Sequence, residues 1–240
     1  MRLTSVFFIM IAVVILAAIF QLGIVISLAH IAVAVAAILL MRLYLTMVDP
    51  FYLEWYRFPK GVHYSPQSFF MLPFPFLRMY NSKKYGIYNV FQLPYKCYYD
   101  ISIVGDHWNK VGGVSFGRLH RNSIRLGWRP KNENYFECCF YWYECGIRKE
   151  STPFELCWGT NHYITIDNDM FSVYNMHIEV KGDYLHLDGA KPIAVFEYDD
   201  YNIKHTQRRY KFILVPYFGG RVARTPHKMN VQYITKKYRI

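Results

Sequence analysis

The stretch that decides the fold is NSIRLGWRPKNENYFECCFYWYEC, residues 122–145, which contains two segments with the pattern of β-strands. Side chains alternate between two faces along a strand. One face of residues 122–129 carries Asn122, Ile124, Leu126 and Trp128, and the other carries Ser123, Arg125, Gly127 and Arg129. We expect the first face to lie in a core. Residues 135–145 are apolar or aromatic on both faces, which predicts a central strand.

The remainder of residues 85–240 repeats this organisation of short strands separated by turns. Turn signals occur at Gly112-Gly113, Asp188-Gly189 and Gly219-Gly220. No stretch after residue 60 shows a long helical period. The pattern predicts an antiparallel, jelly-roll-like β-sandwich over 85–240. Its further candidate strands are 96–104, 111–117, 155–158, 162–167, 170–180, 184–188, 192–198, 209–217 and 228–236.

Three short motifs carry a resemblance to a known family. They are Asn122–Arg129 (NSIRLGWR), Pro216–Gly220 (PYFGG) and Pro226-His227. Together they resemble a signature, NSxRxGWR … PYFGG … PH, of uncharacterised bacterial β-sandwich proteins, over about residues 100–235. Thr225 stands where the signature has Ala. The family has no assigned activity, so the resemblance implies a sandwich and transfers no catalytic residue.

The N-terminal region has a different character. Residues Leu3–Met41 contain no charged side chain, and the run is interrupted at Gln21-Leu22-Gly23. About 20 apolar residues of helix cross a bilayer core of about 30 Å. We therefore expect a transmembrane helical hairpin in residues 1–48, with helices at about 3–20 and 24–45. The basic residues Arg2, Arg42, Arg57 and Lys60 flank it, which predicts that both termini and the β-domain are cytoplasmic at the inner membrane.

The second predicted helix carries a seam of small residues. These residues recur at steps of three and four: Gly23, Ser27, His30, Ala34 and Ala37. Small residues let helices approach closely in lipid, so the seam predicts packing on the first helix or on another subunit, as a homo-oligomer or part of a membrane complex. His30 is either a neutral imidazole bonded to Ser27 or a partner, or a functional intramembrane group. Its role stays open.

Residues 49–84 are rich in aromatic side chains and proline, and we interpret them as a juxtamembrane segment. The aromatic and basic residues expected at the membrane interface are Tyr44, Phe51, Tyr52, Trp55, Tyr56, Arg57 and Lys60. Prolines at 50, 59, 66, 73 and 75 oppose a long helix or a central strand. The sequence leaves open whether this segment lies on the bilayer or on the sandwich.

Charge and cysteine usage restrict the partners. The chain of 240 residues has a net charge of +11, and 26 basic and 16 acidic side chains lie beyond residue 49. A basic domain beside a bilayer favours anionic lipid headgroups over nucleic acid, for which no binding motif is present. The five cysteines lack zinc-site spacing and form an odd count. This indicates reduced thiols in a cytoplasmic domain, with no metal and no cofactor.

The strongest candidate binding site lies on the polar face of 122–129. Arg125 and Arg129 flank Gly127, which leaves room for a shallow anion or glycan site, and Trp128 and His120 are further candidates. The alternative is a pair of solvated arginines beside a bulge. No HExxH, GxSxG, Walker A or GxGxxG motif is present. Asp199 and Asp200 follow a predicted strand, where alternation would place neighbouring side chains on opposite sides, so we expect no glycosidase pair there. An enzyme is therefore not favoured.

Two hypotheses for function follow. The first is a non-enzymatic integral membrane protein that displays a basic β-sandwich for binding of lipid headgroups or a protein partner. The alternative is a glycan-binding or glycan-processing sandwich, which requires an extracytoplasmic domain. The second rests on an analogy between folds.

Overall fold

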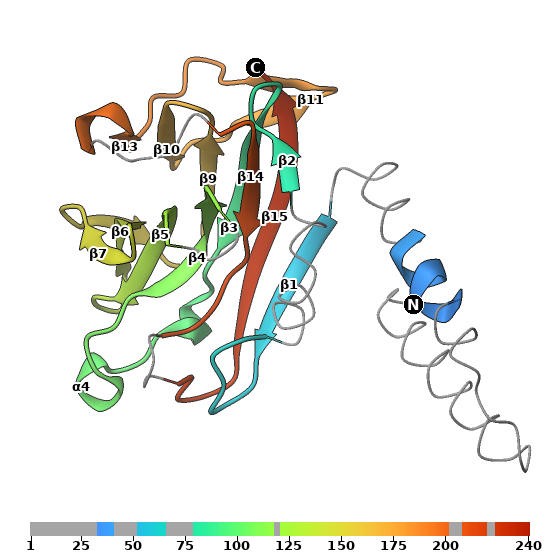
Figure 1. Ribbon diagram of the computed structural model, residues 1–240. Helices are drawn as coiled ribbons and strands as arrows, with labels where there is room; N and C mark the ends of the chain where they lie inside the picture. Colours follow the sequence, from blue (N-terminus) through green and yellow to red (C-terminus); the bar gives the residue numbers. More distant parts are fainter. Residues whose placement is uncertain (1–32, 41–51, 66–78, 118–120, 202–207, 220–223) are drawn as a thin grey trace, which may run out of the picture. The chain divides into compact units, whose positions relative to one another are not determined.

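The computed structural model describes residues 33–40, 52–65, 79–117, 121–201, 208–219 and 224–240 (Figure 1). The chain divides into two compact units, Met1–Asp49 and Pro50–Ile240. In the first unit, the described part is a helix at residues 33–40. Ala34 and Ala37 lie on this helix and are exposed, whereas Gly23, Ser27 and His30 fall outside the described residues.

The structure contradicts the predicted two-helix transmembrane hairpin. In the described part of the chain, no helix is long and apolar enough to cross a membrane. An α-helix of eight residues rises about 12 Å, less than half of a bilayer core of about 30 Å. The other residues of 3–20 and 24–45 fall outside the described part. The prediction was wrong because an uncharged run reports composition and does not fix the length of a continuous helix.

The predicted location in the inner membrane depended on that hairpin and is corrected with it. The same holds for the cytoplasmic orientation, which was inferred from charges flanking the two expected helices. The predicted lipid-headgroup partner loses its basis for the same reason.

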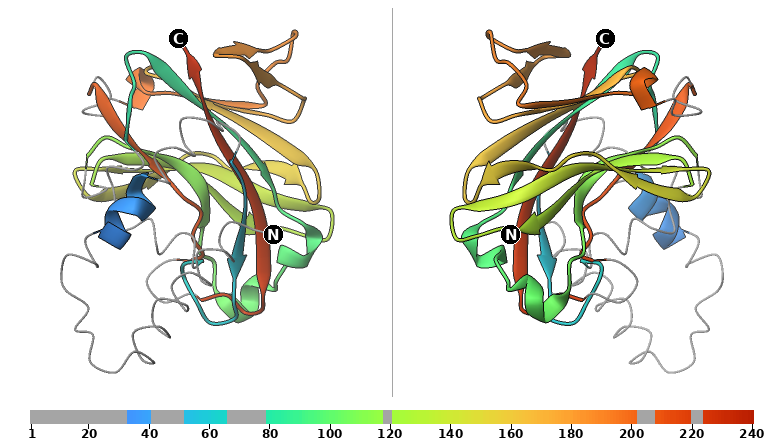
Figure 2. Two further views of the ribbon diagram at one scale, coloured as in Figure 1. Left: turned by 90° about the vertical axis from the view of Figure 1, so that its right-hand side faces the viewer. Right: turned by 90° about the vertical axis from the view of Figure 1, so that its left-hand side faces the viewer.

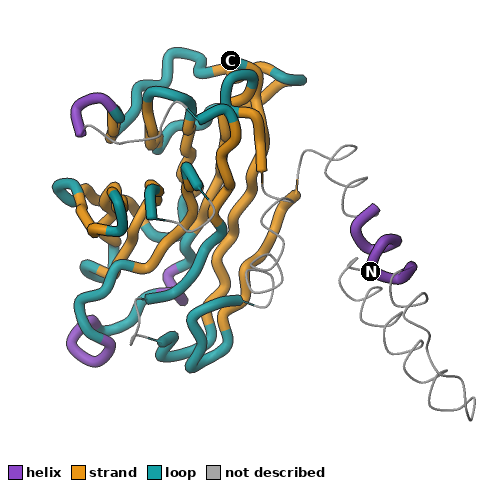
Figure 3. The backbone as a smooth tube through the Cα atoms, viewed as in Figure 1, coloured by secondary structure: helices purple, strands orange, loops and turns teal. Residues whose placement is uncertain are grey.

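The second unit is a β-sandwich of two antiparallel sheets (Figures 1 and 3). The first sheet has the order β1 (Tyr52–Phe58), β15 (Met229–Arg239), β3 (Tyr85–Gln92), β9 (Asn161–Ile166), β10 (Met170–Tyr174) and β13 (Ala194–Glu197). The second has the order β2 (Met79–Asn81), β14 (Tyr210–Leu214), β4 (Asn109–Ser115), β5 (Ser123–Pro130), β6 (Tyr135–Glu144) and β7 (Ile147–Glu150). A further strand, β8 (Phe154–Cys157), also pairs with β6, and β11 (Glu179–Lys181) forms a hairpin with β12 (Tyr184–His186).

The core fills the space between the two sheets, whose strands curve around it (Figure 2). Ile124, Leu126 and Trp128 of β5 are at most 2% exposed and pack in this core. From the first sheet, Phe91 and Ile164 are fully buried in the same cluster. The predicted inward face is therefore confirmed for Ile124, Leu126 and Trp128, but not for Asn122, which precedes β5, is half-buried and accepts a hydrogen bond from the Cys145 N–H. β6 has strands on both sides, as expected for a central strand.

The predicted strand at 96–104 is instead a 3-10 turn, η2 (Tyr95–Cys97), followed by a short helix, α4 (Ile101–Val104). Asp100 caps α4, because its carboxylate accepts a hydrogen bond from the backbone N–H of Ser102 at 2.8 Å. Gly105 ends the helix with φ of 93°. These are ordinary helix start and stop signals.

Residues 49–84, described above as a juxtamembrane segment, contribute strands to both sheets. β1 is an edge strand paired with β15, and β2 is an edge strand paired with β14. Tyr56 of β1 is 3% exposed and packs in the core at 6.1 Å from Tyr233, measured between ring centroids. Edge strands tolerate the prolines that precede and follow β1.

A β-bulge in β4 determines which of its side chains face the core and which face the outer surface of the second sheet. Lys110 pairs with Gly127, but Gly112 pairs with Leu126, so the register shifts by one residue at Val111. Val111 is fully buried in the core, and a side chain at Gly112 would meet the Tyr233 hydroxyl at 2.0 Å. Both positions therefore face inward, which leaves Lys110 on the opposite, outer face.

Candidate functional site

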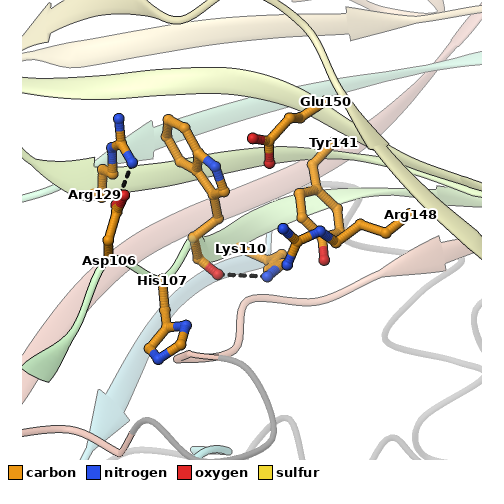
Figure 4. A pocket seen from close by; sticks show the side chains of 8 residues that line it. Asp106, His107, Lys110, Arg129, Tyr141, Arg148 and Glu150 are labelled. Atoms are coloured by element: carbon orange, nitrogen blue, oxygen red, sulfur yellow. Dashed lines mark hydrogen bonds and ion pairs between the residues drawn. The ribbon is translucent and has the colours of Figure 1, made fainter.

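The outer face of β4–β7 carries a pocket of about 120 Å³, which is enough for several water molecules. β4 and the segment before it contribute Asp106, His107, Trp108 and Lys110. The strands β5, β6 and β7 contribute Arg129, Tyr141, Arg148 and Glu150. Figure 4 shows Lys110, Tyr141 and Arg148 together on one side of this outer-face pocket and Arg129 with Asp106 on the other.

Strand pairing brings these side chains together. Arg125 on β5 lies opposite Tyr141 on β6, and Tyr141 lies opposite Glu150 on β7. Arg148 lies two residues before Glu150, so both point to the same side of the sheet. Gly127 has no side chain beneath Lys110, and an added Cβ would approach Trp108 to 3.4 Å.

Lys110 is the most unusual group of the pocket. It is 3% exposed, and its Nζ donates a hydrogen bond to the Trp108 carbonyl oxygen. The same Nζ lies 4.2 Å from the Tyr141 ring centroid and 5.3 Å from that of Tyr217. Burial, followed by repulsion from Arg125 and other cations, lowers the pKa of Lys110 from 10.5 to about 7.

Four tyrosine side chains, called the tyrosine wall below, lie near this lysine: Tyr64, Tyr141, Tyr143 and Tyr217. Tyr217 forms an isolated bridge with Lys110, with backbone hydrogen bonds of 2.9 and 3.0 Å. The Tyr64 ring packs on Tyr217 with centroids 5.5 Å apart. Tyr141 and Tyr143 share a hydrogen bond of 3.1 Å between their hydroxyl groups. The wall therefore combines apolar ring faces with polar ends.

Two arginines of β5 face the outside, as the alternation of 122–129 predicts, but they have different environments. Arg129 bonds to Asp106 and to Glu137, the latter at 2.8 Å, and its guanidinium lies 4.3 Å from the Trp108 ring centroid. Burial lowers its pKa, and the two carboxylates outweigh that effect and raise it.

Arg125 lies over the Tyr217 ring at 5.1 Å, and burial lowers its pKa. Its buried Nε has no hydrogen-bond partner in the described part of the chain. Arg129 is therefore neutralised by two carboxylates, whereas Arg125 forms no ion pair among the described residues.

The other predicted site residues lie elsewhere. Trp128 is 2% exposed in the core, with its ring 6.1 Å from Trp158 and 6.2 Å from Tyr99. His120, Tyr44 and Phe51 fall outside the described residues. The backbones of Tyr52 and Trp55 are part of β1. Arg57 and Lys60 are exposed, whereas Tyr56 is buried. Which of these residues bind a ligand or a membrane stays a prediction.

Most residues of the pocket were not predicted from the sequence, above all Lys110, Tyr141, Arg148 and Glu150. Alternation along 141–143 and 148–150 is a local signal that marks one face of these two strands. In the sequence, only the Gly112-Gly113 pair indicates the bulge at Val111, and this bulge decides which side chains of β4 share the outer face with Lys110. Among the described residues, no group of three His, Cys, Asp or Glu side chains is arranged to hold a metal ion.

Comparisons with known proteins give no family. No family model and no curated protein matches the sequence. Solved structures with some similarity include a GH43B protein of the Bacteroides ovatus xyloglucan locus, at 9% identity and a TM-score of 0.39 over 65% of this chain and 27% of that one. A xylan β-1,4-xylosidase from Bacillus halodurans C-125 has 12% identity and a TM-score of 0.39 over 73% and 29% of the two chains.

A third similar structure is the CBM2 module of an evolved Dit protein of Lactobacillus casei BL23 phage J-1. It has 9% identity and a TM-score of 0.34, and the match covers 67% of this chain and 64% of that one. This chain spans about a third or less of the length of the xylosidase and the GH43B protein. Because the TM-scores lie below 0.5, these similarities carry no argument about function. The resemblance to uncharacterised bacterial β-sandwich proteins stays a prediction.

Proposed function

We propose that the β-sandwich is a carbohydrate-binding module and that its ligand lies in the outer-face pocket. The observation that carries this proposal is the combination of aromatic rings with both cationic and anionic side chains around one hollow of about 120 Å³. Binding sites of this kind join apolar surface to a few polar groups that fix the orientation of the ligand.

A sugar ring carries several hydroxyl groups, which donate and accept hydrogen bonds. The aromatic rings of the pocket offer it little stacking surface, because Tyr141 is 3% and Trp108 is 6% exposed, so polar contacts would make most of the binding. Arg148 and Lys110 offer donors, and the carboxylate of Glu150 offers an acceptor. Hydrogen bonds to charged partners are stronger than neutral ones and give directional recognition.

Binding is favoured over hydrolysis by the arrangement of carboxylates. Glycoside hydrolysis commonly uses one carboxylic acid and one carboxylate placed on either side of the bond that is cleaved. The pocket is lined by two carboxylates, and Asp106 is engaged by the guanidinium of Arg129. Glu150 alone is left, which supplies one acceptor for a hydroxyl group and not a catalytic pair.

The experiment is a screen of the full-length chain against an array of oligosaccharides, followed by calorimetric titration with those that bind. Glu150→Gln tests the pocket, because Glu150 is exposed on an edge strand and its replacement spares the core. Its matched control is Glu133→Gln, another exposed glutamate, in the turn between β5 and β6.

We expect Glu150→Gln to weaken binding by about tenfold, the value of one charge-assisted hydrogen bond, and Glu133→Gln to leave it unchanged. The proposal fails if no oligosaccharide binds, or if the two variants bind as tightly as the natural sequence.

A further inference from the structure

The charges around the outer-face pocket indicate what kind of sugar it takes. In the described part of the chain, Lys110, Arg125 and Arg148 form no ion pair, although the pocket places carboxylates nearby. The two carboxylates closest to β5 are engaged by Arg129. For Lys110 and the buried Nε of Arg125 this arrangement is costly, because a buried charge needs a counter-charge or several hydrogen bonds, whereas Arg148 is exposed.

A comparison of Lys110 with a second buried lysine, Lys211, shows that the environment of Lys110 is unusual. Lys211 on β14 is fully buried, and its Nζ donates to Asn168 Oδ1 at 3.0 Å, with Asp167 and Asp169 close enough to favour its charge. Lys110 has one backbone carbonyl, two aromatic rings and, beyond ion-pair distance, the carboxylate of Glu150, which also favours its charge. Among the described residues, the fold therefore supplies a side-chain hydrogen bond for Lys211 but none for Lys110, which faces a pocket.

The three cations act on one another. Arg125 and Arg148 both disfavour the charge of Lys110, which means that they lie close enough to repel it. Arg125 also has a buried Nε without a hydrogen-bond partner among the described residues. An oxyanion placed between these groups would relieve the repulsion and supply acceptors for their donors.

Glu150 lines the same pocket, and its carboxylate lies near enough to Lys110 to favour the charge of that lysine. A carboxylate also repels an anion, so an anionic substituent belongs on the side of Lys110 and Arg148. Figure 4 shows Arg148 reaching toward Lys110. The hydroxyl groups of the same ligand then lie toward Glu150.

We propose that the ligand is an acidic carbohydrate, whose carboxylate or sulfate group is held by Lys110 and Arg148 in the pocket, while Arg125 adds positive charge from outside the pocket lining. This inference rests on the proposed carbohydrate-binding function and narrows it to one class of sugar. Lys110 and Arg148 each contribute a charge-assisted hydrogen bond to the oxyanion, and the sugar ring that bears it lies in the same pocket.

The test compares three probes by calorimetric titration of the full-length chain. They are a galacturonate oligomer, a sulfated galactose oligomer and a neutral galactose oligomer of similar length. We expect the carboxylate or the sulfate probe to bind at least about tenfold more tightly than the neutral one, and to weaken as NaCl is raised from about 50 to about 500 mM. Which of the two acidic probes binds identifies the oxyanion.

Two pairs of variants locate the effect. Arg148→Gln, on an exposed edge strand, is expected to weaken the acidic probe by about tenfold and the neutral one by less than about twofold. Its control is Arg57→Gln, an exposed arginine on the edge strand of the other sheet, which is expected to change neither. Lys110→Met is expected to act like Arg148→Gln, and Lys211→Met is its buried control.

The outcomes separate this inference from the function on which it rests. Equal affinity for the acidic and neutral probes overturns the acidic class but leaves carbohydrate binding intact. Acidic binding that Arg148→Gln and Lys110→Met leave unchanged also overturns it, because the anion is then held elsewhere. If none of the three probes binds and the array is also negative, the carbohydrate-binding function itself fails. If inorganic sulfate competes as strongly as the sulfated sugar, the pocket is an anion site without selectivity for sugars.

Discussion

Replacement of Lys110 by methionine is expected to stabilise the protein while it weakens the binding of an acidic ligand. Burial and neighbouring cations lower the pKa of this lysine from 10.5 to about 7. A tenfold change in a protonation equilibrium corresponds to about 1.4 kcal/mol, so retention of the lysine opposes folding by about 4 kcal/mol at pH 7. Methionine has a similar length and no charge. Methionine also removes the hydrogen bond to the Trp108 carbonyl oxygen, which lowers the free energy of unfolding by about 1 kcal/mol. We expect a net gain of about 2–3 kcal/mol in the free energy of unfolding.

The pH dependence has a defined sign. Between pH 7 and 10.5 the unfolded chain holds a proton on Lys110 that the folded chain has released. Stability therefore rises with pH across this window, because the unfolded state binds more protons. The methionine variant lacks this contribution. Lys211, whose pKa burial lowers to about 8, still gives a smaller rise above pH 8.

The assay is urea unfolding of the full-length chain, followed by tryptophan fluorescence at pH 7 and pH 9. Lys96→Met, at an exposed lysine of η2, is the control and is expected to change stability by less than about 0.5 kcal/mol. The reasoning is refuted if Lys110→Met destabilises the protein at pH 7, or if the rise in stability between the two pH values is the same in the variant and the natural sequence.

Three further changes test the fold. Gly113→Ala places a Cβ 2.1 Å from the Ile124 carbonyl oxygen at φ of +151°, so we expect a loss of about 3 kcal/mol or more by urea unfolding. Gly61→Ala, also at positive φ but with no atom within 4 Å, is expected to cost only about 1 kcal/mol, and equal losses would contradict the packing of β4 on β5. Cys145 and Cys157 are exposed and the other three thiols are buried, so a thiol reagent is expected to modify two cysteines in the folded protein and five in urea. Modification of more than two before unfolding would count against the described core. Tyr198→Phe removes a buried hydroxyl without a partner among the described residues and is expected to be neutral or stabilising by up to about 1 kcal/mol. A clear loss of stability would show that this hydroxyl is hydrogen-bonded.

The part of the fold that the sequence predicts is the part that depends on local alternation. Ile124, Leu126 and Trp128 are core residues, and Arg125 and Arg129 face outward, because side chains of a strand alternate whatever its neighbours are. The sandwich class follows from many such segments.

The helix α4 could have been predicted from its capping residues, but its apolar residues were interpreted as a strand. Its apolar residues also fit a strand, but Asp100 and Gly105 are a typical start and stop for a helix. The N-terminal hairpin was predicted from hydropathy alone, without any start or stop signal for its helices, and no helix in the described part of the chain is long and apolar enough to cross a membrane.

The candidate site was harder to predict because most of its contacts are distant in sequence. Lys110 meets Tyr141 and Tyr217 only through the pairing of strands far apart in the chain. The bulge at Val111 then reverses the direction that simple alternation gives to residues beyond it. Arg125 and Arg129 were both predicted as site residues, but the difference between their environments was not. Asp106 and Glu137 neutralise Arg129 only once the sheet has folded, and sequence alternation does not show this pairing.

The central claim is that a carbohydrate ligand binds on the outer face of the second sheet. Hydrogen exchange of the full-length chain, with and without a saturating oligosaccharide, tests it most directly, because it reports the position of the ligand independently of any substitution. The account predicts that protection increases in residues 106–110 and 141–150 and stays unchanged in β1 and β15. Protection confined to the first sheet, or no change in 106–110 and 141–150 at saturation, would contradict it.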